Sequence, residues 1–269
     1  MRAWSRSRCK EAALRACSLL QRRGQALTVV LMYHAVGSGG IDPSMLRDQA
    51  AHLRAHYDVR PLRELRAPCG PPAPSRSAAR QPDHAPAGSR PVACLTFDDG
   101  YLDNYEVALP ILEEAGVRAT FFLVSSMLGG PFETSKGVRT MMQPDHARTM
   151  AELGHEIGAH TVTHPKLTQI PPEEARAEIA GSKHQLEDLL GAPVTSFAYP
   201  KGRVNETVRA LVGEAGFQRA VTTREAFVGA GPDWLMLPRV SAEEARTMRL
   251  FRAKLSPGLE LYERLRRSL

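Results

Sequence analysis

The sequence predicts an α/β fold with parallel strands, because short apolar runs alternate with segments that carry helix signals. Residues 91–97 form an apolar run without a helical period, which is typical of a buried strand. Residues 26–34 and 119–124 have the same character, and a helical segment follows each of them. No internal repeat interrupts this order, and 269 residues are enough for one domain of this class with an ample core.

The helices are predicted from their start and stop signals. The first begins at Pro43, because proline suits the first helical position and Asp42 can cap it. A glycine follows each of the other four. The expected helices are 43–56, 104–115, 143–153, 171–190 and 204–215, and the expected strands or short apolar runs are 26–34, 91–97, 119–124, 155–159, 196–202 and 220–222.

The chain is expected to have three parts: a basic arm over residues 1–25, a folded domain over 26–240 and a helical segment over 241–269. The last segment begins with a capping box, formed by Ser241 and Glu244. Residues 67–90 are rich in Pro, Ala, Ser and Arg and lack apolar periodicity. This stretch is therefore expected to be a flexible surface insertion in the domain.

The formal charge of +6 lies at one end of the chain, where residues 1–23 hold seven basic residues against Glu11 alone. The rest of the chain is close to neutral, so its charge does not indicate nucleic-acid binding by the folded domain. The basic arm could be a solvated extension or could contact anionic lipid. Because no signal peptide or transmembrane run is evident, we expect a protein that is cytoplasmic or peripheral to the inner membrane. Four cysteines without paired spacing do not indicate a disulfide framework.

Two short motifs carry the chemistry: Thr96-Phe97-Asp98-Asp99-Gly100 and His160-Thr161-Val162-Thr163-His164. Adjacent residues at a strand end point in different directions, so one aspartate can bind a metal ion while the other faces the attacking water. Two histidines four residues apart can converge on the same cation. Each motif alone also has an ordinary reading, as a turn or as structural histidines. Together they supply three metal ligands and a base, which are the groups that metal-assisted hydrolysis requires.

A third motif, Ser196-Phe197-Ala198-Tyr199-Pro200-Lys201-Gly202, completes a resemblance to the polysaccharide deacetylases, carbohydrate esterases with a NodB homology domain. The resemblance covers roughly residues 27–240 and implies a distorted (β/α) barrel with fewer strands than eight. It also implies that a divalent metal, usually zinc, is held by Asp99, His160 and His164 and that Asp98 is the general base. The third motif, with Tyr199 and the backbone N–H of Lys201, is expected at the oxyanion and the substrate.

Two positions depart from the family pattern. Ala198 stands where many members have an arginine that braces the catalytic aspartate, and no histidine follows His184 to serve as the general acid. Tyr33-His34, at the end of a predicted strand, resembles the permuted poly-N-acetylglucosamine deacetylases, whose last motif lies at the N-terminus. We therefore expect His34 to be the general acid. Arg239 is expected near the oxyanion and substrate, where it could replace the missing bracing arginine.

The sequence thus predicts metal-dependent hydrolysis of N-acetyl groups from an amino-sugar glycan, which could be an N-acetylglucosamine-type polymer or a lipid-linked precursor. Its expected partner is that acetylated glycan. The two departures keep open a catalytically impaired glycan-binding module of the same fold. A two-histidine, one-carboxylate iron oxygenase shares the ligand set, but no cosubstrate site is recognisable in the sequence.

Overall fold

The computed structural model describes residues 28–65, 90–134, 137–256, 258–259 and 261–263. Eight strands in this part of the chain form one curled sheet in which all paired neighbours are parallel. The order is β10-β1-β3-β4-β7-β8-β9, and β2 also pairs with β3. The strands are β1 (Thr28–Tyr33), β2 (Asp58–Val59), β3 (Val92–Phe97), β4 (Thr120–Leu123), β7 (Glu156–Ala159), β8 (Ser196–Ala198), β9 (Arg219–Val221) and β10 (Val240–Ser241).

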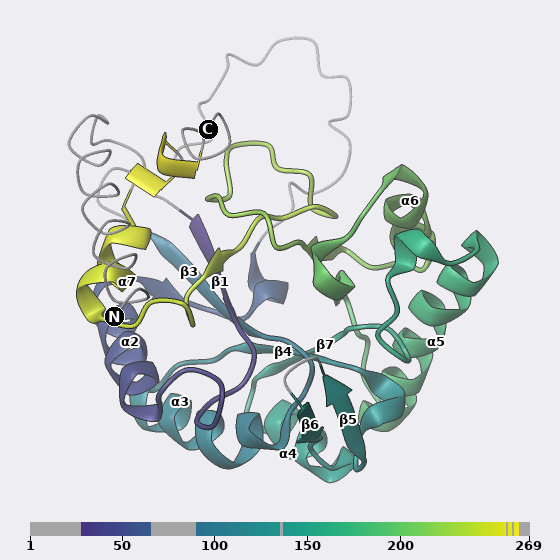
Figure 1. Cartoon of the computed structure of the whole chain (residues 1–269), viewed down its shortest axis with the longest axis horizontal. Coiled ribbons are helices and arrows are strands. Elements are labelled where there is room, and N and C mark those ends of the chain that lie inside the picture. The colour runs from purple at the N-terminus through teal and green to yellow at the C-terminus, as the bar shows by residue number, and fades with distance from the viewer. Residues whose placement is uncertain (1–27, 66–89, 135–136, 257, 260, 264–269) are drawn as a thin grey trace.

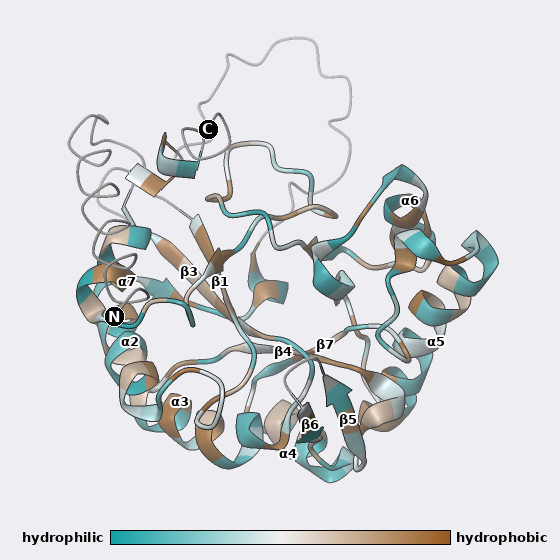
Figure 2. Cartoon of the chain, viewed as in Figure 1, coloured by the Kyte–Doolittle hydropathy of each residue, from teal (hydrophilic) through white to brown (hydrophobic). Residues whose placement is uncertain are grey.

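Helices surround the outer face of this sheet (Figure 1). They are α2 (Pro43–His56), α3 (Leu109–Ala115), α4 (Pro144–Glu152), α5 (Pro172–Leu190), α6 (Glu206–Glu214) and α7 (Met248–Lys254). Figure 2 shows apolar residues along the central strands and polar residues on the outward sides of the helices, which is the pattern of one buried layer between sheet and helices. A separate antiparallel hairpin, β5 (Pro131–Thr134) with β6 (Gly137–Thr140), lies between β4 and α4 in the chain.

The two ends of the curled sheet meet through one segment, residues 237–241. At its start Leu237 exchanges backbone hydrogen bonds with β9, from Leu237 N to Ala220 O (2.9 Å) and from Thr222 N to Leu237 O (2.8 Å). At its end the segment becomes β10 and pairs with β1. This placement brings residues near position 240 next to strands from the start of the chain.

Side chains alternate between the two faces of each strand. On β1, Val29, Leu31 and Tyr33 belong to the cluster that includes the helices, whereas Val30 belongs to a second cluster inside the curled sheet. Strand β3 follows the same rule, with Cys94 in the inner cluster. Continuing by steps of two from Cys94 leads to Thr96 and then to Asp98, which therefore stands at the mouth of the interior.

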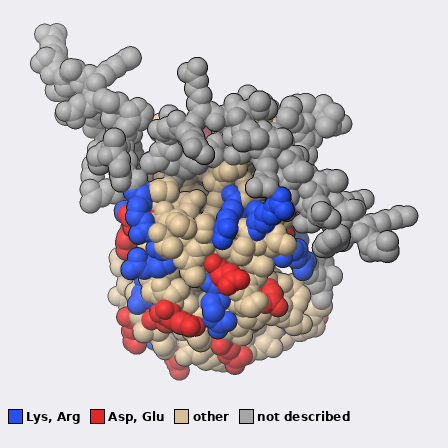
Figure 3. Space-filling model, turned by 90° about the vertical axis from the view of Figure 1, so that its left-hand side faces the viewer, with Lys and Arg blue, Asp and Glu red and all other residues tan. Residues whose placement is uncertain are grey.

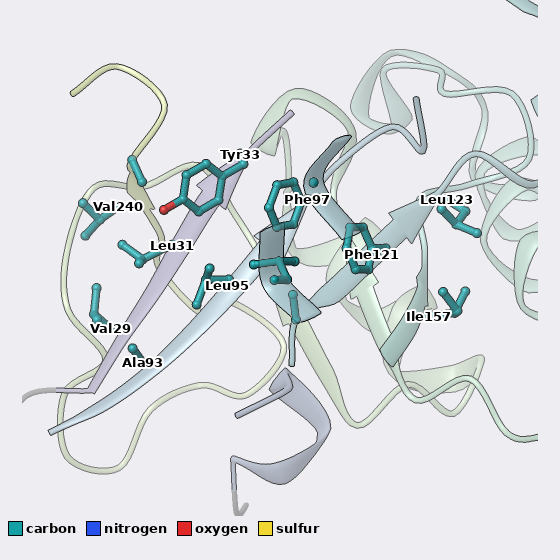
Figure 4. Packing of buried hydrophobic residues seen from close by; sticks show 14 of the residues in the cluster. Val29, Leu31, Tyr33, Ala93, Leu95, Phe97, Phe121, Leu123, Ile157 and Val240 are labelled. Atoms are coloured by element: carbon teal, nitrogen blue, oxygen red, sulfur yellow. The ribbon is translucent and has the colours of Figure 1, made fainter. Parts of the chain in front are cut away.

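Three aromatic rings stack on the outer face of adjacent strands (Figure 4). Tyr33, Phe97 and Phe121 lie in register, and the ring centroids are 4.9 Å apart in each of the two pairs. All three rings are fully buried. Because Tyr33 and Phe97 directly precede His34 and Asp98, this stack fixes the strand ends from which those two side chains project.

Most sequence-predicted elements are present with shifts of a residue or two at their ends. Helix α2 has the predicted bounds, and Asp42 caps it by accepting a hydrogen bond from Ser44 N (2.8 Å). The predicted helix 104–115 begins as a π-helical turn, Asn104–Ala108, before α3. Neither the short β2 nor the hairpin β5–β6 was expected.

The capping box predicted at Ser241 is wrong. Ser241 lies in β10, paired in register with Met32, because pairing with β1 outweighs the local helix signal. The helix begins later, at α7, where Thr247 caps it by accepting a hydrogen bond from Leu250 N (3.1 Å). Helix α7 joins the main core, and its fully buried Lys254 donates to Glu225 Oε1 (2.8 Å) and Ser241 O (2.7 Å).

The predicted basic arm and nearly all of the predicted insertion lie outside the described residues. Within them, the face that carries α2 and α7 shows basic and acidic side chains interspersed, not a field of one sign (Figure 3). No helix in this part of the chain is long and apolar enough to cross a membrane. Cys94 is buried and unpaired in the inner cluster.

Candidate metal centre and active site

The expected site residues meet at the carboxyl ends of the strands, where a parallel barrel places its active site. His34 follows β1, Asp98 and Asp99 follow β3, and His160 follows β7. An open cavity of about 470 Å³ is lined by all four of them and by His164 and Lys201. The fold thus collects side chains from positions 34 to 201 around one space.

The backbone around this cavity is locally constrained. Among the described residues, the non-glycine residues with positive φ are Asp99 (75°), Thr161 (68°), His164 (63°) and Lys201 (55°). Three of them line the cavity and Thr161 follows His160. Such conformations cost on the order of 1–3 kcal/mol each and concentrate at functional sites, where they aim a side chain that a relaxed turn would not.

Asp99, His160 and His164 form a set of metal-ligating groups. One ligand atom from each lies within 4.8 Å of the other two, and Asp99 Oδ1 is 3.6 Å from the Nε2 atoms of both histidines. His160 Nδ1 lies 2.7 Å from Ala198 O, a contact in which the ring donates its proton, so Nε2 is left with its lone pair toward Asp99 and His164. This two-histidine, one-carboxylate set fits a zinc-like divalent cation with positions to spare.

The charge state of His164 also suits a ligand. Burial, the largest cause, and the charge of the neighbouring His160 lower the pKa of His164 to about 4, against the opposing effects of Asp99 and Asp98. The ring is therefore neutral at pH 7, which is the form that binds metal ions.

Asp98 is buried and held by a guanidinium fork. Arg239 donates from Nη1 to Asp98 Oδ1 (2.7 Å) and from Nη2 to Asp98 Oδ2 (2.6 Å), and it also donates to Thr96 Oγ1 (3.0 Å) and Thr222 O (2.8 Å). Burial raises the pKa of Asp98, but the charge and hydrogen bonds of Arg239 outweigh it and hold that pKa well below its usual range. Asp98 is thus an oriented carboxylate at neutral pH.

Arg239 replaces the missing bracing arginine as expected, but neither its side chain nor that of Tyr199 lines the cavity, where both were expected near the substrate. Arg239 is fully buried behind Asp98 and does not line the cavity. Tyr199 is also fully buried, packs against Phe197 and donates its hydroxyl to Leu235 O (2.8 Å). Tyr199 follows β8, and its ring belongs to the main core cluster. Although it lies in a motif expected at the substrate, its side chain packs in the core.

Replacing Arg239 with methionine is expected to lower the free energy of unfolding by about 3–5 kcal/mol, because it leaves the buried Asp98 carboxylate without its counter-ion. Denaturant unfolding of both proteins measures the difference. Arg209→Met is the matched control, since Arg209 pairs with Asp233 at the surface and should cost at most about 1 kcal/mol. Equal losses in the two variants would show that the buried pair does not stabilise the fold.

His34 lies in the same cavity, with Nε2 3.9 Å from Asp98 Oδ2. Its other face is held by Glu243, whose Oε1 is 3.0 Å from His34 Nδ1 and whose Oε2 accepts from His34 N at 3.0 Å. Burial lowers the pKa of His34, but the hydrogen bond to Glu243 and the charges of Asp98 and Glu243 outweigh it and raise that pKa to about 9. The imidazole is therefore cationic at neutral pH.

Glu243 is not among the residues expected from the sequence. Glu243 would have been recognisable only if β10 had been predicted, because it lies two residues after that strand, at the edge of the sheet where the site lies. The sequence analysis instead predicted a helix that begins at Ser241, which places Glu243 inside that helix. Lys201, by contrast, lines the cavity as expected of the third motif.

Comparisons with known proteins agree with this architecture. The family model for polysaccharide deacetylases matches residues 85–220, half of the chain. YxkH of Bacillus subtilis, which carries the name of a polysaccharide deacetylase, is 27% identical over 232 residues, covering 86% of this chain and 72% of that protein. The peptidoglycan-N-acetylglucosamine deacetylase PgdA of Listeria monocytogenes is 27% identical over 150 residues, covering 55% of this chain but 30% of PgdA.

Solved structures share the fold. The deacetylase PplD of Streptococcus pyogenes, solved with acetate, superposes with a TM-score of 0.68 at 23% identity, covering 87% of this chain and all of that one. IcaB from Ammonifex degensii has a TM-score of 0.65 at 22% identity, covering 86% of this chain and 98% of that one. The predicted distorted (β/α) barrel of the NodB type is thereby confirmed.

Proposed function

The chain belongs to the polysaccharide deacetylase family, and on that premise we propose that it removes N-acetyl groups from an amino-sugar glycan in a metal-dependent hydrolysis. The observation that carries the proposal is the joint arrangement around one cavity. A braced carboxylate, Asp98, directly precedes the metal-ligating Asp99 and lies 3.9 Å from the His34 imidazole. Hydrolysis of an amide needs a base, a means of polarising the carbonyl and an acid for the leaving amine.

Asp99, His160 and His164 are the residues that would hold the metal, which we propose to be zinc. A divalent cation held there would supply Lewis-acid chemistry: it would polarise an acetamide carbonyl and lower the pKa of a water, so that a weak base such as Asp98 would suffice. These three protein ligands would leave the cation open to water or substrate.

The chain's own residues account for the proton transfers. Asp98 accepts the proton of the attacking water, and the Arg239 fork keeps its carboxylate ionised and oriented for that purpose. His34 delivers a proton to the departing nitrogen, because an amine is too basic to leave without one. The backbone N–H of Lys201, at the cavity wall, is proposed to donate to the oxygen on which negative charge develops.

Acetate release from chito-oligosaccharides, followed together with the mass of the product, tests this function. We expect release of acetate with the glycosidic bonds intact. Binding of the oligomer without any acetate would favour the impaired glycan-binding module instead. The two departures that motivated that alternative are compensated in space, since Arg239 braces Asp98 and His34 lies in the cavity. Parallel assays on a peptidoglycan polymer and a lipid-linked precursor would identify the substrate. Contact of the basic arm with a membrane stays a prediction.

Replacing His34 with alanine is expected to impair cleavage of an amino-sugar acetamide by about 10²–10⁴-fold while sparing an activated aryl acetate ester. The ester's leaving group departs without protonation, so it does not need the acid. Steady-state rates on both substrates measure the difference. An equal loss on the two would assign His34 a structural role, and no loss on the amide would end its assignment as the acid.

Replacing Glu243 with glutamine is expected to move the alkaline limb of the kcat/KM profile on the amide to lower pH. The raised pKa keeps His34 protonated up to about pH 9, and loss of the Glu243 charge lets that pKa fall toward its ordinary value. Glu244→Gln is the control, because Glu244 lines the same cavity and accepts from Lys254 Nζ (3.4 Å). A uniform loss of rate with an unmoved alkaline limb would show that Glu243 acts only on the structure.

A further inference from the structure

The β5–β6 hairpin forms a wall of the cavity outside the barrel. Phe132, Glu133 and Arg139 of the hairpin line the same space as the candidate metal ligands. The base of the hairpin is tied to the loop that carries Asp99, since Met142 N donates to Gly100 O (3.0 Å) and Tyr101 forms a β-bridge with Met141. These contacts fix the position of the hairpin relative to the proposed metal ligand Asp99.

Phe132 differs from every other phenylalanine of the chain. The sequence contains eight, and the other seven are buried in core clusters, whereas Phe132 is partly exposed. Its ring lies 5.6 Å from the His164 ring at 83° and 6.5 Å from the Tyr101 ring, between centroids. The ring packs against the small buried cluster of Ala35, Tyr101 and Met141, yet it stays partly open to the cavity beside the proposed metal ligand His164.

The neighbours of Phe132 are polar and are held in place. Its cross-strand partner Arg139 also lines the cavity, and the Arg139 guanidinium carbon lies 5.5 Å from the Tyr101 ring centroid. Arg139 Nη1 is 3.7 Å from Asp103 Oδ2, and both side chains are about four-fifths buried. The wall therefore offers one apolar ring beside fixed charged groups, the usual composition of a small-molecule site.

We propose that this hairpin is a saccharide-binding wall on which Phe132 stacks against a pyranose ring of the glycan chain. This inference rests on the proposed function and deepens it, since it assigns the residues of the hairpin that contact the sugar. A pyranose presents an apolar face of C–H groups and a rim of hydroxyls. The face matches the electron-rich face of an aromatic ring, and the rim matches the carboxylate of Glu133 and the guanidinium of Arg139.

The test compares Phe132→Ala and Phe132→Trp with the wild type on an N-acetylglucosamine oligomer and on an aryl acetate ester that has no sugar. We expect Phe132→Ala to raise KM for the oligomer by roughly 3–10-fold, the range for loss of one aromatic stacking contact, with little change in kcat or in KM for the ester. Phe132→Trp should restore KM. Val138→Ala is the matched control, since Val138 lies on the same hairpin, is 66% exposed and does not line the cavity.

An unchanged KM for the oligomer in Phe132→Ala would overturn the inference. So would equal losses on both substrates accompanied by loss of bound metal, because Phe132 would then only support His164. If the wild type releases no acetate from the oligomer, the proposed function fails, and the hairpin is still tested by the Kd of the oligomer. A weaker Kd in Phe132→Ala than in Phe132→Trp supports the saccharide wall, and equal Kd values refute it.

Discussion

Replacing His160 with alanine is expected to abolish both metal binding and deacetylation. The substitution removes one of three ligands, and the Nε2 atom it removes lies 3.6 Å from Asp99 Oδ1. The proposed metal supplies several kcal/mol of transition-state stabilisation, so the rate should fall on the order of 10³-fold or more. Metal content by atomic emission and acetate release from a chito-oligosaccharide, both on purified protein, measure the two effects.

His184→Ala is the matched control, since this histidine is exposed on the outer helix α5. It should keep both the metal and the activity. A His160→Ala protein that retained one metal ion per chain would remove His160 from the ligand set. Far-ultraviolet circular dichroism checks that each variant is folded, because an unfolded variant would also lose activity. His164→Ala is a second ligand variant, at a more exposed side chain.

Replacing Asp98 with asparagine is expected to lower the rate by about 10²–10⁴-fold with the metal retained, because the amide keeps the shape of the side chain but cannot accept a proton. The substitution also leaves Arg239 buried without its carboxylate partner, so the free energy of unfolding should fall as well. Rates are therefore compared at a temperature at which both proteins are folded by circular dichroism.

The neighbouring substitution Asp99→Asn provides the contrast. It weakens a proposed metal ligand, so it should lose metal first and activity as a consequence. If Asp98→Asn emptied the site and Asp99→Asn did not, the roles of the two aspartates would be exchanged.

The alternation of parallel strands and helices was predictable from local patterns, because most of these elements carry their own signal, whereas the barrel followed from the resemblance to the family. Helix α2 has the predicted bounds since Asp42 and Pro43 mark its start without ambiguity. The prediction failed where tertiary pairing competes with a local signal. Ser241 reads as a helix cap, yet it pairs with Met32 on β1, more than two hundred positions earlier in the chain.

The site was predictable where its residues share a short motif. Asp98 and Asp99 are adjacent, and His160 and His164 are four residues apart, so spacing alone suggests convergence. The Asp98–Arg239 pair spans 141 positions and the His34–Glu243 pair 209. Both arise because segment 237–241 closes the sheet beside β1, a relation that no local pattern expresses.

The central claim, metal-dependent deacetylation at Asp99, His160 and His164, is tested most directly by stripping the purified protein with a chelator and adding zinc back while acetate release from an N-acetylglucosamine oligomer is followed. The account predicts that the stripped wild type is inactive and that zinc restores its activity, whereas Asp99→Asn, treated identically, does not recover. Undiminished acetate release from wild-type protein shown to be metal-free would contradict it.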